Sequence, residues 1–368
     1  MTTALILLFV VLFVVLAFEY INGFHDTANA IATVVSTKVL TPRQALLLAS
    51  VMNLIGAFVG QAVAKTIHSG LVDDKVVAVT TLTIFCAMLG GIIWNLITWW
   101  FGMPSSSTHA LVGGLVGASL AAAGGNWHVL IWSRPKIDKV TGLQVGMEGI
   151  FHKVVIPMIT SPLLGLTIGF AMMGLLFWLL RNWRPHTVNS VFGKLQIVSA
   201  AGMGLGHGMA DAQKSMAVIM LTLFGATAAG ELNALPSWLH FLRIEDKSVA
   251  IPTWIVVTCA VTMAAGTYAG GWRIIKTLGH KMVKMKPVHG FAAETTAAAI
   301  LVGTAYMGMP VSTTHTITTS IMGVGAAKRW NAIQWSLVER IVWAWIMTIP
   351  ITAALSYVIY QVCAIWAV

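Results

Sequence analysis

Long apolar runs separated by short polar connections dominate the chain. Such runs cover residues 4–37, 42–64, 77–100, 152–180 and 250–270, and each reaches the length of about 20 residues that a helix needs to cross a bilayer. The connections between them are too short to hold a soluble domain. The pattern therefore predicts an all-α polytopic membrane protein.

Two polar motifs recur in the same order in each half of the chain. The stretch GMPSSSTHALVGGLVGA at 102–118 matches GMPVSTTHTITTSIMGVGA at 308–326, and NGFHDTANA aligns with HGMADAQKS, which places Asp26 opposite Asp211. Chance is a poor explanation for two matched pairs of motifs in the same order. They predict a duplicated transporter half.

The positions of Lys and Arg predict that the two halves are inverted. Short cytoplasmic connections are enriched in these residues, and much of the net charge of +10 lies in segments such as 181–194 and 273–286. With an external N-terminus, the two hairpins that carry GMP motifs enter from opposite sides of the membrane. We therefore expect two inverted-topology repeats, each with a broken motif helix and a re-entrant helical hairpin.

This topology predicts a specific division of the chain. The expected parts are a first repeat at 1–150 with motif helix 4–37 and hairpin 77–122, a connecting span and short cytoplasmic loop at 151–194, and a second repeat at 195–368 with motif helix 195–225 and hairpin 290–327. Glycines one turn apart predict close helix packing at Gly56 and Gly60, Gly113 and Gly117, and Gly165 and Gly169.

Composition narrows the function classes. Hydrophobic residues make up 57% of the chain and charged residues only 9%, which excludes a soluble globular protein. The basic connections are typical of loops that meet anionic membrane lipid, so we expect no nucleic-acid partner. The three cysteines lie in apolar runs without paired spacing, and no cofactor or metal site is predicted.

Asp26 is an acidic residue inside an apolar run that is long enough to cross a membrane. If its helix starts near Ala4, 22 residues of helix place it roughly 33 Å along the axis, and an ionised carboxylate at membrane depth must pair or bind a cation. Gly23 and the glycines before Asp211 favour a helix break that frees carbonyl ligands. Asp26 therefore indicates cation coupling; the alternative is a structural pair with a buried base such as Lys214, which need not exclude coupling.

Hydroxyl clusters follow the proline of each hairpin motif. A helix that starts there presents unpaired N–H groups, hydroxyl donors and the positive end of its dipole, which suit a tetrahedral oxyanion. The alternative is two ordinary helix N-caps, and duplication favours the anion site. The predicted phosphate-binding hydroxyls are Ser106, Ser107, Thr108, Ser312, Thr313 and Thr314.

Other polar residues at membrane depth are weaker candidates. Gln213 and Lys214 follow Asp211 and offer an amide and an ammonium to a bound anion. Glu19 and Glu294 are equally consistent with ion linkage or gating and with a satisfied structural hydrogen bond. The four motif histidines are predicted mainly to cap helices and donate hydrogen bonds, with proton coupling open for one of them: His25, His109, His207 and His315.

Taken together, GFHDTANAIAT, HGMADAQKS, PSSSTH and PVSTTH resemble the PiT family of inorganic phosphate transporters over essentially the whole chain. The resemblance implies a homodimeric carrier in the cytoplasmic (inner) membrane that moves inorganic phosphate with a cation. It also implies that the hairpin hydroxyls bind phosphate. The motif residues that it implies for the cation are Asp26, Asn29 and Asp211, to which we add Glu294.

One departure from the family pattern bears on the coupling ion. The position before Asp211, where the family usually has Asn, is Ala210, and the first copy has His25. The second motif thus lacks an oxygen ligand for sodium. This favours H⁺ over Na⁺, or cotransport of a neutral divalent metal–phosphate complex. A sodium-coupled symporter, an anion channel and a membrane enzyme acting on a phosphorylated substrate are the alternatives.

Overall fold

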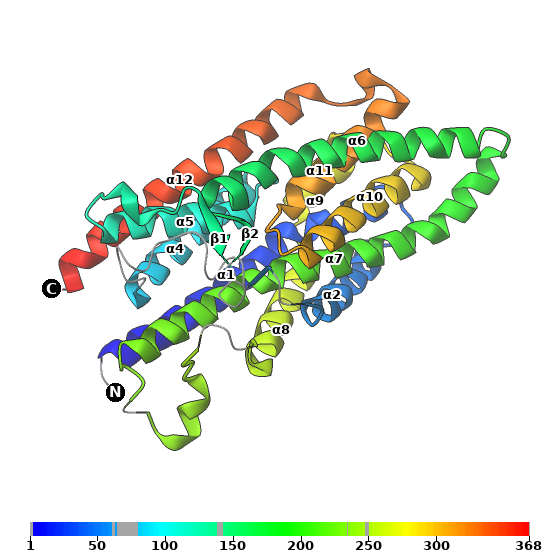
Figure 1. The fold of residues 1–368 in the computed structure, drawn as a ribbon. Helices are drawn as coiled ribbons and strands as arrows, with labels where there is room; N and C mark the ends of the chain where they lie inside the picture. Colours follow the sequence, from blue (N-terminus) through cyan, green and yellow to red (C-terminus); the bar gives the residue numbers. More distant parts are fainter. Residues whose placement is uncertain are drawn as a thin grey trace.

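The computed structural model describes residues 3–60, 63–64, 80–137, 143–233, 235–246 and 250–367. Its regular structure is almost entirely helical (Figure 1). Among the described residues, helices long and apolar enough to cross a membrane are Leu5–Ser36, Thr81–Trp100, Phe151–Leu179 and Trp335–Ile365, with a fifth span if the bent pair Thr253–Ala269 and Trp272–Lys281 counts as one. The prediction of an all-α multi-pass protein is confirmed.

The elements follow the chain in this order. The first half contains α1 (Thr3–Ser36), α2 (Pro42–Ala57), α4 (Thr81–Trp100), α5 (Ser107–Ala122), the 3-10 turn η1 (Trp127–Val129), β1 (Arg134–Ile137), β2 (Gln144–Glu148), the π-helical turn η2 (Phe151–Val155) and α6 (Ile156–Leu179). The second half contains α7 (Pro185–Ala228), η3 (Ser237–Leu242), α8 (Thr253–Ala269), α9 (Trp272–Lys276), η4 (Thr277–Lys281), α10 (Pro287–Tyr306), α11 (Thr313–Lys328), η5 (Trp330–Ala332) and α12 (Trp335–Ala367).

Several predicted boundaries differ from the structure. The cytoplasmic loop expected to reach residue 194 is mostly helix, because Pro185 at the first position starts α7 ten residues before the predicted 195. The span predicted at 42–64 ends its helix at Ala57. A short antiparallel ribbon of β1 and β2 lies in the connection 123–150, which also holds the 3-10 turn η1. Residues 77–79, the predicted start of the first hairpin, lie outside the described part.

The prediction of a break in each motif helix is wrong. Both α1 and α7 run without interruption through their aspartates. The glycines serve close packing instead: a Cβ on Gly23 would overlap the Met263 carbonyl of α8, and one on Gly208 would overlap the Asn53 main chain of α2. Glycine here lets two backbones approach, and neither helix is interrupted at its aspartate.

The helices of the two halves pack in matching pairs. α1 lies on α8 while α7 lies on α2, α4 packs with α5 as α10 packs with α11, and α12 covers α5 while α6 covers α11. The last helix of each half thus covers the hairpin of the other half. In Figure 1, α1 and α7 run in opposite directions through the centre of the bundle. The inversion of the two halves stays a prediction.

Glycine pairs occur where two of these helices touch. Gly113 and Gly117 of α5 lie against the main chain of α12, and Gly165 and Gly169 of α6 lie against α11, as predicted. Gly60 is different, since it follows the end of α2 with a φ of +84° and packs against no neighbouring helix backbone.

Gly117→Ala should lower the thermal stability of the protein in detergent, because the added Cβ overlaps the Ala353 main chain of α12. Overpacking of this kind costs about 1–3 kcal/mol. Gly174→Ala is the matched control, since a Cβ at Gly174 of α6 meets nothing within 4 Å. Equal melting temperatures for the two variants would show that the contact between α5 and α12 tolerates separation.

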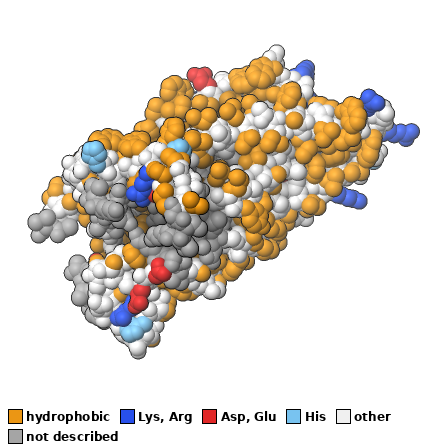
Figure 2. Space-filling view, viewed as in Figure 1, with side chains coloured by type: hydrophobic (Ala, Val, Ile, Leu, Met, Phe, Trp, Pro, Cys, Tyr) orange, Lys and Arg blue, Asp and Glu red, His pale blue; other side chains and the backbone are white. Residues whose placement is uncertain are grey.

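The surface shows how the bundle lies in a membrane. Hydrophobic side chains cover the long middle of the molecule, and Lys and Arg side chains gather at the end where α6 turns into α7 (Figure 2). The opposite end carries acidic as well as basic side chains on this face. Because cytoplasmic loops are rich in Lys and Arg, the basic end fits the cytoplasmic side.

Candidate functional site

Each hairpin turns at its Gly-Met-Pro sequence. Gly102 and Gly308 have φ of 64° and 65°, the left-handed conformation that glycine commonly adopts just after a helix. In both hairpins the glycine N–H and the following N–H bond back to carbonyls in the last helical turn. The motif therefore ends α4 or α10 and brings the start of α5 or α11 into the interior.

The hydroxyl cluster then starts the next helix. Ser106 caps α5 by accepting a bond from the His109 N–H at 3.2 Å, and Ser312 caps α11 through the His315 N–H at the same distance. These two serines are therefore helix N-caps, as the alternative interpretation predicted. Accepting an N–H bond leaves each serine its own O–H to donate. The remaining four hydroxyls lie in the first turns and are buried: Ser107, Thr108, Thr313 and Thr314.

Both hairpin tips meet at Asp26 in the middle of α1. Ser107 of α5 donates to Asp26 Oδ2 at 3.1 Å, and Thr314 of α11 donates to Oδ1 at 3.5 Å. One turn later on α1, the Asn29 amide donates to Thr313 at 3.2 Å and to Thr314 at 2.9 Å. The Asp26 carboxylate thus joins two helix N-termini that lie far apart in sequence, and the Asn29 amide adds contacts to one of them.

Asp211 of α7 completes the group from the other half. Thr313 donates to Asp211 Oδ2 at 3.4 Å, Lys214 Nζ lies 2.8 Å from Oδ1, and His207 Nε2 lies 3.3 Å from Oδ2. All of these side chains are buried. Lys214 therefore pairs with Asp211, and the alternative that it pairs with Asp26 is wrong.

Two carboxylates approach each other closely in this buried place. Ligand atoms of Asp26, His207 and Asp211 all lie within 4.8 Å of one another. Like charges at such a distance in a low-dielectric interior repel unless a proton or a cation lies between them. Lys214 offsets one of the two charges, so the geometry still favours one more positive charge beside Asp26.

A histidine lies beside each of the two aspartates. His25 directly precedes Asp26 in the sequence, whereas His207 lies one helical turn before Asp211. His25 Nδ1 lies 2.7 Å from Asp26 Oδ1, and its Nε2 contacts the Thr98 hydroxyl at 3.0 Å. Ala210 offers no ligand, as expected, and His207 reaches Asp211 from one turn earlier. An imidazole nitrogen therefore lies beside each of the two carboxylates.

Two predicted residues lie away from this centre. The side-chain oxygen Oε1 of Gln213 accepts N–H bonds from Val63 at 2.9 Å and Ala64 at 3.2 Å. The Gln213 side chain therefore holds the segment that follows α2. Glu294 of α10 accepts bonds from Ser199 of α7 at 2.5 Å and from Thr33 of α1. Its carboxylate forms a second buried polar cluster on the side toward the C-terminal end of α1.

Glu19 lies on the other side of the centre. Ser215 of α7 donates to Glu19 Oε2 at 2.5 Å, while Oε1 has no hydrogen-bond partner among the described residues. Glu19, Asp26 and Thr33 are seven residues apart and share one face of α1. Thr33, Ser199 and Ser215 were not among the predicted residues; the heptad spacing on α1 identifies Thr33, whereas no such signal marks the two serines of α7.

Comparisons with known proteins agree over the full chain. The model of the phosphate transporter family matches residues 22–356. Proteins named probable low-affinity inorganic phosphate transporter are 39% identical in Bacillus subtilis over 98% of both chains, and 41% identical in Rhizobium meliloti over 98% of this chain and 97% of the relative.

A solved structure has the same fold. The sodium-dependent phosphate transporter matches with a TM-score of 0.77, covering 98% of this chain and 99% of its own, at 21% sequence identity. At this identity the match establishes the fold and leaves the coupling ion of the present chain to its own residues.

Proposed function

Because the chain belongs to the phosphate transporter family, and is therefore a membrane transporter rather than an enzyme, we propose that it imports inorganic phosphate across the cytoplasmic membrane by cation symport. The observation that carries this proposal is the buried meeting of Asp26 and Asp211 with the N-termini of α5 and α11. Anion donors and cation ligands share one site.

Phosphate binds between the two hairpin tips in this proposal. Hydroxyls and free N–H groups in the first turns of α5 and α11 donate to its oxygens, and the two helix dipoles favour its negative charge. Lys214 lies beside Asp211 and adds a positive charge. Gln213 stays outside this set, since its amide is already bonded to main-chain groups near residue 63.

Phosphate binding needs a cation because the negative charge of Asp26 repels the anion. A phosphate that approaches Ser107 and Thr314 meets the carboxylate to which both hydroxyls donate. A proton or another cation on Asp26 removes this repulsion, so the two substrates assist each other's binding. Such reciprocity is what symport requires.

We favour the proton over sodium. Sodium is a hard cation that needs several oxygen ligands, whereas His25 and His207 place imidazole nitrogens beside the two carboxylates. The same donor set also suits a divalent metal, which would make a neutral metal–phosphate complex the transported species. Sodium coupling is the alternative.

The proposed transport cycle is alternating access, and the paired packing supports it. In the proposed inverted repeats, each hairpin reaches the centre from its own side of the membrane, and α6 or α12 from the other half covers it. Rocking of one half against the other would open the Asp26 site to each side in turn. A homodimer, as the family resemblance implies, would hold two such units.

Uptake into proteoliposomes tests the coupling ion. We expect saturable phosphate uptake that persists without sodium, rises with an inward proton gradient and collapses when a protonophore removes that gradient. Adding a chelator, then Mg²⁺, separates free phosphate from the metal–phosphate complex.

Two results would contradict this proposal. An absolute sodium requirement with no response to the proton gradient would replace the proton with sodium and leave the symporter intact. Uptake that never saturates and ignores both gradients would instead identify an anion channel, the remaining alternative. Empty liposomes and protein carrying Asp26→Asn serve as background controls.

A further inference from the structure

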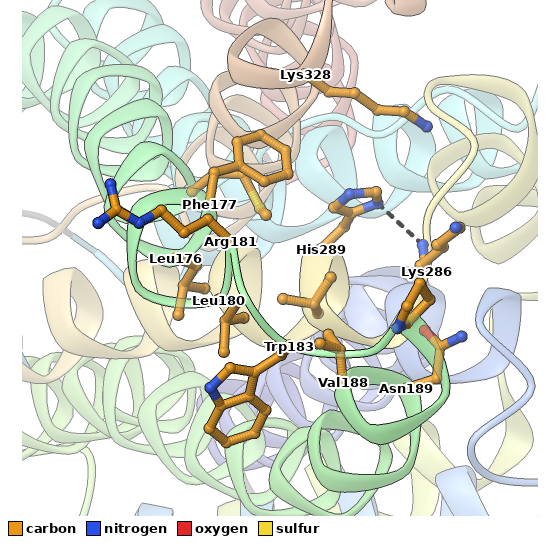
Figure 3. Close-up of a pocket in the computed structure, with 13 residues that line it drawn as sticks. Leu176, Phe177, Leu180, Arg181, Trp183, Val188, Asn189, Lys286, His289 and Lys328 are labelled. Atoms are coloured by element: carbon orange, nitrogen blue, oxygen red, sulfur yellow. Dashed lines mark hydrogen bonds between the residues drawn. The ribbon is translucent and has the colours of Figure 1, made fainter.

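A pocket of about 320 Å³ lies far from the Asp26 site, at the basic end of the molecule. It is bounded by the end of α6, the start of α7, the start of α10 and Lys328 at the end of α11 (Figure 3). Apolar side chains line one part of it, including Leu176, Phe177 and Val188. The pocket belongs to neither the phosphate site nor the cation site.

Three cations surround this pocket, each from a different element. Arg181 follows α6, Lys286 precedes α10 and Lys328 ends α11, and none of the pocket-lining residues is acidic. In Figure 3, Arg181 stands on one side with its guanidinium turned outward, and the two lysines stand on the other. Within the described part of the chain, no carboxylate forms an ion pair with any of these three residues.

A second feature strengthens the positive charge at the pocket. α10 begins here with Pro287, so its dipole places partial positive charge at this end. The buried His289 ring accepts a hydrogen bond from the Lys286 N–H at 3.0 Å, which is drawn in Figure 3. The ring therefore fixes the main chain that carries Lys286 beside the pocket.

The pocket also extends past the end of an apolar helix that is long enough to cross a membrane. Its lining begins at Met173 inside the apolar span Phe151–Leu179 and continues past the end of that span to Arg181 and Trp183. The step from Met173 to Leu180 covers about 10 Å along a helix axis. Trp183 is half-exposed, as is usual for tryptophan at headgroup depth.

We propose that this pocket binds an anionic phospholipid of the cytoplasmic leaflet. Its phosphate group would lie beside Lys286 and Lys328, with the long Arg181 side chain at the opposite edge of the pocket, and the first part of its chains would lie against Phe177 and Leu176. Free phosphate would satisfy the cations equally well, since the two ligands share the phosphate chemistry. The apolar wall inside the span favours the lipid, because a free anion gains nothing from it.

Each of the three cations also has a simpler explanation that involves no bound ligand. Basic residues are common in cytoplasmic loops, and Lys328 also complements the C-terminal dipole of α11. Neither explanation requires three unpaired cations to surround one partly apolar cavity. A comparison with other exposed cytoplasmic lysines separates the two explanations.

The test uses the purified full-length protein in detergent, titrated with phosphatidylglycerol or phosphatidylcholine, with bound lipids counted by native mass spectrometry. We expect tighter binding of phosphatidylglycerol. The triple variant Arg181→Gln, Lys286→Gln, Lys328→Gln should weaken that binding about tenfold or more. The matched control changes the same charge away from the pocket: Lys194→Gln, Lys276→Gln, Lys284→Gln, all exposed positions. It should weaken binding less than twofold.

Three outcomes would overturn the assignment. Equal losses in the two triple variants would show general attraction between the basic end and anionic lipid. Equal affinity of the wild-type protein for the two lipids would show that the cations do not select a headgroup. Displacement of phosphatidylglycerol by millimolar inorganic phosphate would identify a free anion as the occupant. A melting curve for each variant confirms that folded protein is compared.

Discussion

Asp26→Asn and Asp211→Asn should each reduce cation-coupled phosphate uptake to background while the protein still reaches the membrane. Each aspartate receives donors from a hairpin tip, and the substitution keeps its volume while removing the negative charge that holds the cation. Groups that merely orient an ion ligand are worth roughly 10- to 100-fold. We therefore expect uptake to fall about a hundredfold or more.

The two variants should differ in stability. Asp211→Asn leaves Lys214 without its buried ion-pair partner at 2.8 Å, a loss that costs about 3–5 kcal/mol, whereas Asp26→Asn leaves no cationic Lys or Arg unpaired among the described residues. Glu339→Gln is a control for acid removal at an exposed position of α12. Wild-type uptake by both aspartate variants would refute their role in coupling.

Removing the hydroxyls of one hairpin tip should abolish phosphate binding. The variants are Ser106→Ala, Ser107→Ala, Thr108→Ala in one hairpin and Ser312→Ala, Thr313→Ala, Thr314→Ala in the other. A donor to a charged oxygen is worth about 1.5–3 kcal/mol, so three such losses weaken binding by about a thousandfold or more. Isothermal titration with phosphate, in the presence of the coupling cation, measures the change.

A matched variant controls for general loss of hydroxyls. Thr167, Thr222 and Thr304 each donate to a main-chain carbonyl one turn earlier in their own helix. Changing these three to Ala should leave phosphate affinity within about twofold, since none of them faces the site. If a hairpin triple variant kept wild-type affinity, its hydroxyls would act as helix starts only.

The single variants distinguish capping from binding within each tip. Ser106 and Ser312 accept N–H bonds as N-caps, and loss of a cap costs about 1 kcal/mol of stability. Ser107→Ala should instead weaken phosphate binding with little change in melting temperature. The two effects are therefore separable within three adjacent residues.

The sequence predicted the fold class and the polar centre because both have strong local signals. Apolar runs of bilayer length identify spans, and a carboxylate at Asp26 is conspicuous among hydrocarbon side chains. The repeated GMP motif combines a left-handed glycine with a capping serine, so it predicts the turn of each hairpin. These signals do not predict which residue each polar side chain contacts.

Partners depend on packing between distant segments. Gly23 and Gly208 were interpreted as helix breakers, yet each lies against the backbone of a neighbouring helix, which sequence alone cannot distinguish. Gln213 looked equivalent to its neighbour Lys214, but the helix turns it toward residue 63 instead of Asp211. The start of α7 at Pro185 was hidden because a polar, basic stretch looks like a loop whether or not it is helical.

The exchange of covering helices between the two halves has a consequence for biosynthesis. α12 packs on α5, and α6 packs on α11, so the contacts of α5 join residues that the ribosome makes more than half a chain apart. The first hairpin must wait in the membrane, without its permanent cover, until the C-terminal helix has been inserted. Gly113 and Gly117, whose hydrogens lie against that helix, stay uncovered during this interval. Complete assembly is therefore one of the last events of synthesis, and a truncated chain would leave the earlier-made hairpin open.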